Sequence, residues 1–247
     1  MDQVSPLKED HPLVSILIVT YNAEKDLASC LESIATQTYP ALEVVIIDGG
    51  STDRTLEIIQ SYPQIVDHYI TEPDEGIYDA MNKGLDHVTG EWVYFLGADD
   101  TLLPGFSDML FHTLNDPGAI YYGSTIFKGE KYKGFLSPYM MAKIGINHQA
   151  MIYPMRVFQK YRFDTRYRIA ADRILNLLCL KDPEFHFEFV DYILANFNHT
   201  GVSSLEKDPL YEKQKYRLAF KYYGPIIGLR FWFKSFKDKY IRKRNNQ

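Results

Sequence analysis

The chain has 247 residues, of which 46% are hydrophobic and 24% are charged. This size and balance predict a globular protein with one large domain, or one domain with an appendage, and they exclude a disordered chain. The two cysteines, Cys30 and Cys179, each stand within an apolar helical pattern. Two isolated cysteines exclude a disulfide framework and a cysteine metal site.

The formal charge of −5 is unevenly distributed along the chain. Residues 206–247 contain 12 Lys and Arg against 4 Asp and Glu, a net +8, whereas residues 1–205 carry a net −13. We therefore predict an acidic domain at 12–205 and a basic helical tail at 206–247, and an anionic surface is the partner that suits such a tail. An acidic body with one basic tail argues against nucleic-acid binding.

Aromatic and basic residues are mixed in the tail, between Tyr222 and Arg244. A helix of this composition suits the interface of an anionic membrane, and the alternative is a helix that packs on the body with a solvated basic face. No stretch approaches the roughly 20 uninterrupted apolar residues of a membrane span. Residues 1–10 hold no apolar core of signal-peptide length. We therefore expect a cytoplasmic protein, peripherally attached to the inner face of the cell membrane.

Short apolar runs alternate with helical patterns in the first part of the chain. Val14–Thr20 is a nearly continuous apolar run, which is typical of a parallel strand covered on both faces. Further strands are expected at Val44–Ile47, Ile65–Ile70 and Trp92–Leu96, and helices around Leu27–Ile34, Leu56–Ile59 and Ile77–Val88. This alternation predicts an α/β fold with a mostly parallel, Rossmann-like sheet and flanking helices. After about residue 105 the pattern weakens, apart from an amphipathic helix at Arg173–Leu180.

Polar residues follow three of the expected strands, which end at Thr20-Tyr21-Asn22, at Asp48 and at Gly97-Ala98-Asp99-Asp100. In open α/β sheets, ligands bind beyond the carboxyl ends of the strands. The ring of Tyr21 can stack on a nucleobase, and the carboxylate of Asp48 can accept hydrogen bonds from a base or ribose. Each residue alone is also ordinary turn chemistry. Their joint placement on one rim predicts a nucleotide site.

Asp99 and Asp100 are adjacent carboxylates directly after an apolar strand, and they repel each other. A bound divalent cation offsets this repulsion. Mg²⁺ and Mn²⁺ prefer carboxylate oxygens and complete their coordination shells with phosphates and water. A nucleotide diphosphate supplies such phosphates. The alternative is a solvated Asp-Asp turn.

Two blocks of the sequence resemble the signatures of bacterial family-2 glycosyltransferases. VSILIVTYNAEKDLASCLESIATQTYPALEVVIIDGGSTDRTLEII resembles their opening, and EPDEGIYDAMNKGLDHVTGEWVYFLGADD resembles their second block. The resemblance resumes at Asn147-His148-Gln149 and at Ala170-Ala171-Asp172. It implies the nucleotide-diphospho-sugar transferase fold called GT-A, and the transfer of a sugar from a nucleotide sugar to an acceptor hydroxyl in cell-surface polysaccharide synthesis.

The resemblance also implies roles for the residues at matching positions. Asp172 matches the catalytic base. Asp99 and Asp100 match the Asp-x-Asp motif for Mg²⁺ or Mn²⁺, where Gly97 stands in place of the first aspartate of many members. His199 matches, more weakly, a late histidine that reaches the metal or the diphosphate. Donor contacts are expected at Thr20, Tyr21, Asn22, Asp48, Asp74, Asn82, Lys83, Asp99 and His148.

Ordinary structural roles are the alternatives for several of these residues. Asp172 can be the N-cap of the helix that follows it, Lys83 can be a solvated charge, and His148 and His199 can be hydrogen-bonded loop histidines.

The resemblance implies an inverting, single-displacement transfer, for which the sequence shows no protein nucleophile. UDP-sugars are the expected donors, and a glycan or a lipid-linked glycan is the expected acceptor. One alternative is a non-catalytic or partner-binding member of the same fold, which the Gly97 substitution favours. Another is a sugar nucleotidyltransferase, against which the glycine-free loop at Tyr21–Glu24 argues. Walker and dinucleotide-binding glycine motifs do not occur.

Overall fold

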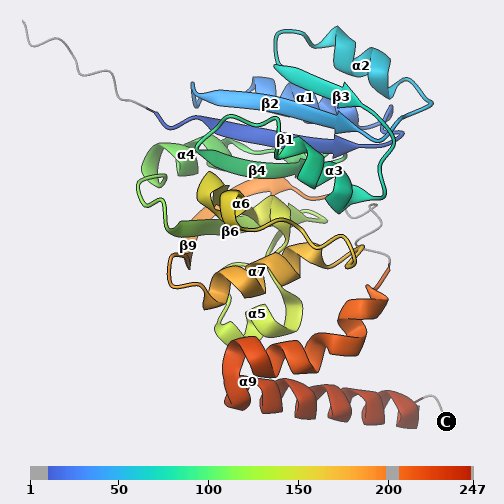
Figure 1. Cartoon of the computed structure of the whole chain (residues 1–247), viewed down its shortest axis with the longest axis vertical. Coiled ribbons are helices and arrows are strands. Elements are labelled where there is room, and N and C mark those ends of the chain that lie inside the picture. Colours follow the sequence, from blue (N-terminus) through green and yellow to red (C-terminus); the bar gives the residue numbers. More distant parts are fainter. Residues whose placement is uncertain (1–10, 199–205, 246–247) are drawn as a thin grey trace, which may run out of the picture.

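The computed structural model describes residues 11–198 and 206–245, with side chains up to Lys234 (Figure 1). Its strands form one sheet in the order β3-β2-β1-β4-β8-β6-β9-β5, and β7 pairs with β6. The strands are β1 (Val14–Thr20), β2 (Leu42–Asp48), β3 (His68–Thr71), β4 (Trp92–Gly97), β5 (Thr101–Leu102), β6 (Ala119–Phe127), β7 (Glu130–Tyr132), β8 (Met151–Pro154) and β9 (His186–Asn196). The helices are α1 (Leu27–Ala35), α2 (Thr55–Ser61), α3 (Ile77–Gly84), α4 (Pro104–His112), α5 (Pro138–Ile144), the short 3₁₀ helix η1 (His148–Ala150), α6 (Met155–Lys160), α7 (Ala171–Lys181) and α9 (Pro209–Asn245).

The predicted strands of the first part are present and parallel. β1 pairs with β2 and β4, and β2 pairs with β3, in parallel register throughout. Thr20 lies opposite Asp48, and Val19 lies opposite Gly97. The polar residues that follow these strands therefore share one edge of the sheet, as the sequence predicts. The third strand begins later than expected, at His68, because the backbone at Ile65 folds back in a turn on Tyr62.

The second part of the chain completes the sheet with strands that the sequence pattern does not reveal. β8 is antiparallel to both β4 and β6, whereas β9 is parallel to β6 and antiparallel to β5. The sheet is therefore mixed, with its parallel half built from the first four strands. Shortly after β9, the N–H of Asn198 donates to Asp100, which follows β4.

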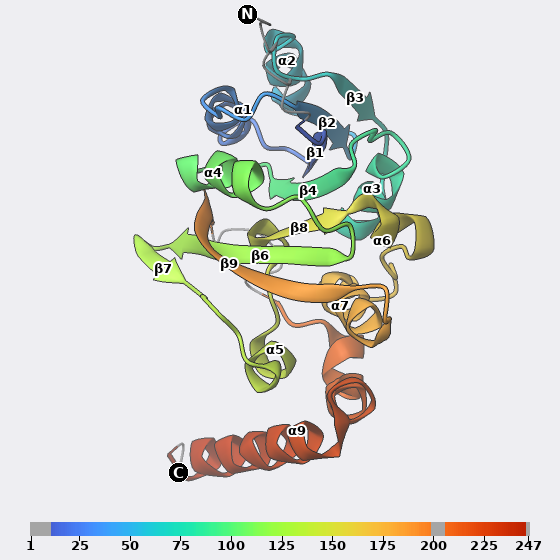
Figure 2. The ribbon, with the colours of Figure 1, turned by 90° about the vertical axis from the view of Figure 1, so that its left-hand side faces the viewer.

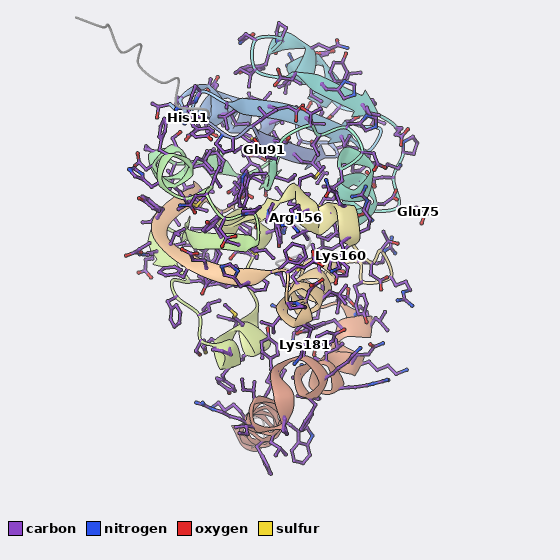
Figure 3. All side chains as sticks on the ribbon, turned by 60° about the vertical axis from the view of Figure 1, so that its left-hand side comes forward. His11, Glu75, Glu91, Arg156, Lys160 and Lys181 are labelled. Atoms are coloured by element: carbon purple, nitrogen blue, oxygen red, sulfur yellow. The ribbon has the colours of Figure 1, made fainter. Side chains whose placement is uncertain are left out.

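Helices cover both faces of the sheet. One face is packed by α1 and α4, and the opposite face by α3, α6 and α7 (Figure 2). The predicted apolar face of α1 is confirmed, because Leu27, Cys30, Leu31 and Ile34 are all buried. Lys160 on α6 contacts Asp182 at 2.6 Å and Glu184 at 2.7 Å, and these ion pairs tie α6 to the residues just after α7 (Figure 3).

The tail is the helix α9, which lies at one end of the molecule (Figure 1). This helix packs against α5 and α7. A kink at Gly224, where φ is +83°, followed by Pro225, divides α9 in two, because neither residue continues a helix readily. The second half returns along the first, and Phe231 is buried with its ring 5.4 Å from that of Tyr216. Among the described residues, no helix is long and apolar enough to span a membrane.

Candidate active site

Asp48 is buried at the end of β2, and its carboxylate organises the following turn. Its Oδ2 accepts a hydrogen bond from the Ser51 N–H at 3.0 Å, and its Oδ1 accepts one from the Ser51 hydroxyl. Thr20, in register with Asp48, is also buried, and its Oγ1 has no hydrogen-bond partner among the described residues.

Tyr21 presents an open aromatic ring at the same edge. Its side chain is 63% exposed, and both this ring and the Asp74 carboxylate lie against Gly49, with no room for a side chain at that glycine. Asn22 adopts a φ of +50°, and its Oδ1 accepts a hydrogen bond from the Thr52 N–H at 2.9 Å. An exposed ring beside a carboxylate is a suitable platform for a nucleobase.

Asn82 and Lys83, both on α3, make contacts within the protein. The Asn82 amide donates to the Phe163 carbonyl at 2.9 Å and accepts from the Phe163 N–H at 3.0 Å. The Lys83 ammonium donates to the Pro73 carbonyl at 2.8 Å and pairs with Glu72 at 2.9 Å. These contacts anchor α3 and its flanks. A role of Asn82 or Lys83 in donor binding stays a prediction.

Asp99 and Asp100 converge beside Gly97. A Cβ atom built on Gly97 would lie 2.5 Å from Asp100 Oδ2 and 3.1 Å from Asp99 Oδ1. Asp100 is buried, its Oδ1 accepts the Asn198 N–H at 2.8 Å, and its Oδ2 has no hydrogen-bond partner in the described part of the chain. Burial raises the pKa of Asp100 to about 7, with a further contribution from the charge of Asp99, despite the hydrogen bond from Asn198.

This arrangement fits a divalent cation that binds together with phosphates. Two carboxylate oxygens face one point, and one of them is buried with its hydrogen-bonding capacity unused, which is costly without a ligand. In the described residues no group of three or more acidic, histidine or cysteine side chains stands ready to hold a metal ion alone. His199, the third predicted ligand, lies outside the described residues.

Asp172 lies in the first turn of α7, largely buried, with its Oδ2 3.5 Å from Nδ1 of His148. Its Oδ1 accepts the Arg173 N–H at 2.7 Å. Burial raises the pKa of Asp172, but the His148 ring and the Arg173 charge oppose it, and the net pKa is lowered. The N-cap position of α7 is Ala170, so the alternative in which Asp172 is the N-cap is wrong.

Asp172 lines a cavity of about 200 Å³ between η1, α7 and the end of β7. His148 and Gln149 are buried in this wall, where Nδ1 of His148 makes a long contact of 3.5 Å with Asp172 and Oε1 of Gln149 has no hydrogen bond to any described residue. The same holds for both polar atoms of the neighbouring Asn147 amide. Buried polar groups are normally hydrogen-bonded. This wall therefore has the unfilled donors and acceptors of a site for a polar ligand.

The sequence missed the positively charged side of the cavity, where Lys133 and Arg173 lie. Lys133 belongs to the region in which no periodic pattern is readable, so only its charge gave a signal. It also missed Tyr78, whose hydroxyl donates to the Ile169 carbonyl at 3.1 Å and so holds the segment that leads to Asp172.

Comparisons with known proteins agree with this fold. A relative named PGL/p-HBAD biosynthesis glycosyltransferase, from Mycobacterium tuberculosis, is 36% identical over 202 residues, which cover 77% of this chain and 78% of the relative. The Escherichia coli protein named uncharacterized glycosyltransferase YibD is 38% identical over 99 residues, 39% of this chain and 29% of that protein.

Solved structures share the fold at low sequence identity. Staphylococcus aureus TarS in complex with UDP-GlcNAc matches with a TM-score of 0.66 at 17% identity, over 89% of this chain and 71% of that chain. The mannosyltransferase PcManGT from Pyrobaculum calidifontis, in complex with GDP-Man and Mn²⁺, matches with a TM-score of 0.65 at 19% identity, over 93% and 72%. The expected GT-A fold is thereby confirmed.

The family whose sequence profile matches residues 15–176 is described as Glycosyl transferase family 2. That span includes the carboxyl edge of the parallel strands, the paired carboxylates and Asp172. The chain belongs to glycosyl transferase family 2.

Proposed function

We propose that the protein is an inverting, metal-dependent glycosyltransferase that transfers one sugar from a nucleotide-diphosphate sugar to the hydroxyl of a cell-surface glycan precursor. The observation that carries this proposal is the closeness of two acidic sites. Asp100, which converges with Asp99 beside Gly97, accepts the N–H of Asn198 at 2.8 Å, and the neighbouring residue Phe197 lines the cavity of Asp172.

The nucleotide of the donor is assigned to the carboxyl edge of β1 and β2. Tyr21 offers its exposed ring to the base, beside the carboxylate of Asp74 and the buried Asp48. UDP is the favoured nucleotide, because the TarS complex contains UDP-GlcNAc; the GDP-Man complex of PcManGT keeps a guanine donor open.

Asp99 and Asp100 would hold Mg²⁺ or Mn²⁺ together with the donor diphosphate. The cation, when bound, offsets the negative charge that develops on the leaving diphosphate. The orphaned Oδ2 of Asp100 supports this assignment, as does the Mn²⁺ in the PcManGT complex.

Asp172 would accept the proton of the acceptor hydroxyl while that oxygen attacks the anomeric carbon. Its lowered pKa keeps the carboxylate charged at neutral pH, and the Arg173 N–H fixes one of its oxygens. Attack from the face opposite the diphosphate inverts the anomeric carbon, and no covalent enzyme intermediate is needed.

The first experiment is a calorimetric titration with UDP, GDP, dTDP and CDP, each with and without Mn²⁺. We expect one nucleotide, UDP first, to bind only with the metal and to lose that binding in the Asp99→Asn/Asp100→Asn variant. The matched control is Asp86→Asn, a surface carboxylate paired with Arg162. Failure of all four nucleotides to bind with Mn²⁺ would overturn the proposal.

A second assay separates the competing functions. Release of free sugar and UDP from a UDP-sugar, in the presence of Mn²⁺, is expected of a transferase that lacks its acceptor. A non-catalytic member would bind UDP but release nothing. A nucleotidyltransferase would instead form a nucleotide sugar and pyrophosphate from UTP and a sugar phosphate.

We further propose that α9 holds the enzyme on the anionic inner face of the membrane, near a lipid-linked acceptor. Ile226, Leu229 and Phe233 are 82%, 46% and 61% exposed, and they lie three or four residues apart on the face opposite the buried Phe231. Arg230, whose guanidinium lies 4.1 Å from the centre of the Tyr139 ring on α5, is an exposed basic residue next to that face. Exposed apolar and basic residues side by side are the composition of an interfacial helix.

A further inference from the structure

The cavity beside Asp172 has a positively charged wall that the proposed chemistry uses only in part. Lys133, directly after β7, and Arg173, next to Asp172 on α7, both line it. In the proposed transfer Arg173 helps to keep Asp172 charged, but Lys133 has no part in it. Lys133 therefore calls for a separate explanation.

Both the backbone conformation and the partly buried ammonium of Lys133 are energetically unfavourable. Its backbone has a φ of +53°, which is uncommon for a residue other than glycine. Its ammonium lies 5.0 Å from the centre of the Tyr132 ring, and it makes no hydrogen bond or ion pair with any residue that the structure describes. Burial, and then the charge of Arg173, lower the pKa of Lys133 to about 8, although Asp172 opposes this shift. A partly buried cation of this kind is stabilised by an anion.

Arg173 is held rigidly at the same wall. One terminal nitrogen donates to the Ile144 carbonyl at 2.6 Å, and the guanidinium lies 5.3 Å from the centre of the Tyr211 ring. Gly145, with a φ of +67°, lets the guanidinium approach, because a Cβ there would lie 3.0 Å from its Nε. The position of this charge is therefore set by the backbone around it.

We propose that Lys133 and Arg173 form a cationic subsite that binds an anionic group, a carboxylate or a phosphate, on the acceptor beside Asp172. Two cations face one carboxylate here, so the wall keeps a net positive charge. The unpartnered amide of Asn147 lines the same cavity and can donate to an anionic oxygen. This inference rests on the proposed function, since Asp172 identifies the acceptor side.

The acceptor, and not the donor diphosphate, is the source of the anion because of where the cations lie. Lys133 and Arg173 line the same cavity as Asp172, and neither Asp99 nor Asp100 lines it. A diphosphate held by Asp99 and Asp100 would therefore have its anchor outside this cavity.

The test compares matched small probes on the full-length protein, with and without UDP and Mn²⁺, by nuclear magnetic resonance titration. Methyl glucuronide and methyl glucoside differ only in carboxylate against hydroxymethyl, and inorganic phosphate represents the other anion. We expect the glucuronide or phosphate to bind at least about tenfold more tightly than the glucoside, the value of a charge-assisted hydrogen bond. Preference for the glucuronide names a sugar acid as the source, and preference for phosphate names a phosphorylated acceptor.

Variants of Lys133 test whether this residue causes the preference for anionic probes. Lys133→Ala should abolish the preference for anions, and Lys133→Arg should retain it. Lys131→Ala is the matched control, because Lys131 is two residues away on β7 and pairs with Asp191 at the surface. UDP affinity with Mn²⁺ should be unchanged in all three variants.

Two results would overturn the subsite. One is that a protein that binds UDP with Mn²⁺ binds the anionic and neutral probes equally, or binds none of the probes. The other is a fall in UDP affinity in Lys133→Ala as large as the fall for the anion, which would assign Lys133 to the donor. A wild-type protein that binds no nucleotide contradicts the proposed function instead, and the probe titrations without UDP still decide the subsite.

Discussion

Asp172 combines burial with a lowered pKa, and its neighbours explain how. A carboxyl group whose pKa is lower in the folded state contributes stability above its unfolded pKa and loses it as the pH falls through the folded value. His148 and Arg173 supply that stabilisation here, against the desolvation cost. The carboxylate is therefore charged throughout the neutral range and ready to accept a proton.

A pH–rate profile tests this description. Because the pKa of Asp172 lies below its ordinary value of 3.8, we expect no acid limb near neutral pH when Mn²⁺ is saturating. At limiting Mn²⁺ an acid limb should appear near pH 7, because Asp100, with a pKa of about 7, must lose its proton to bind a cation. An acid limb near neutral pH that ignores the Mn²⁺ concentration would contradict both statements.

Asp172→Asn should abolish most of the transfer without weakening the donor. Loss of a general base lowers turnover by about 10²–10⁴-fold, while the affinity for UDP with Mn²⁺ should stay the same. Turnover and calorimetry measure the two effects. Asp164→Asn serves as the control, because Asp164 pairs with Arg166 at the surface. Wild-type turnover in Asp172→Asn would remove Asp172 from the chemistry.

Gly97 stands where the resemblance places the first aspartate of many family members, and a side chain there would meet the Asp100 carboxylate. Since a Cβ at Gly97 would lie 2.5 Å from Asp100 Oδ2, a side chain there must displace the carboxylate. We predict that Gly97→Ala raises the Mn²⁺ concentration needed for half-maximal activity. Gly134→Ala, where nothing lies within 4 Å of the new Cβ, is the control. Unchanged Mn²⁺ dependence in Gly97→Ala would show that Asp100 moves freely or does not bind the metal.

At the scale of elements, the start of α9 is joined to the segment before Asp172. Asp208 is buried, its Oδ1 accepts the Tyr211 N–H at 2.9 Å, and its Oδ2 accepts the Ile169 N–H at 3.0 Å. One carboxylate thus caps the tail helix and fixes the loop that presents the proposed base. The tail helix is therefore part of the catalytic domain's support, more than a free appendage.

Asp208→Ala should show this coupling. Loss of an N-cap lowers the free energy of unfolding by about 0.5–2 kcal/mol. Because the variant also loses the hydrogen bond to Ile169, its turnover should fall more than its affinity for UDP. Thermal unfolding and steady-state kinetics measure these effects. Glu212→Ala, in the first turn of the same helix, removes only a local pair with Lys215 and is the control. Equal losses of turnover in the two variants would argue against a specific role for Asp208.

The parallel half of the sheet and its carboxyl edge could be predicted, because both depend on local patterns. Continuous apolar runs mark β1, β2 and β4, and their register brings Thr20, Asp48 and Gly97 to one edge. The mixed half could not be predicted, since β6, β8 and β9 are joined by long-range pairings that no local periodicity encodes. Lys133 enters the site through that half, and for this reason its position could not be predicted from the sequence.

At the scale of the whole molecule, α9 lies at the opposite end of the molecule from α2 (Figure 1), and Ile226, Leu229 and Phe233 on it are exposed. Phe231 and Gly228 face the first half of the helix, where a Cβ on Gly228 would lie 2.6 Å from the Phe220 ring. This hairpin turns Leu229 and Phe233 outward. A rigid helix with an outward apolar face can dock on a surface without first unfolding.

Vesicle binding by the full-length protein tests this role of α9. We expect sedimentation with vesicles that contain anionic phosphatidylglycerol, weakened by added salt because the basic residues supply part of the attraction. Trp232→Glu should reduce the bound fraction, since it places a charge beside Phe233, whose ring centre lies 4.9 Å from that of Trp232, while UDP-sugar hydrolysis in solution should not change. Phe111→Glu is the matched control, because Phe111 is 42% exposed against 43% for Trp232 and lies on α4. Equal sedimentation of both variants and the wild type would mean that the exposed apolar face of α9 does not contact the vesicle. The basic residues alone would then have to account for any binding.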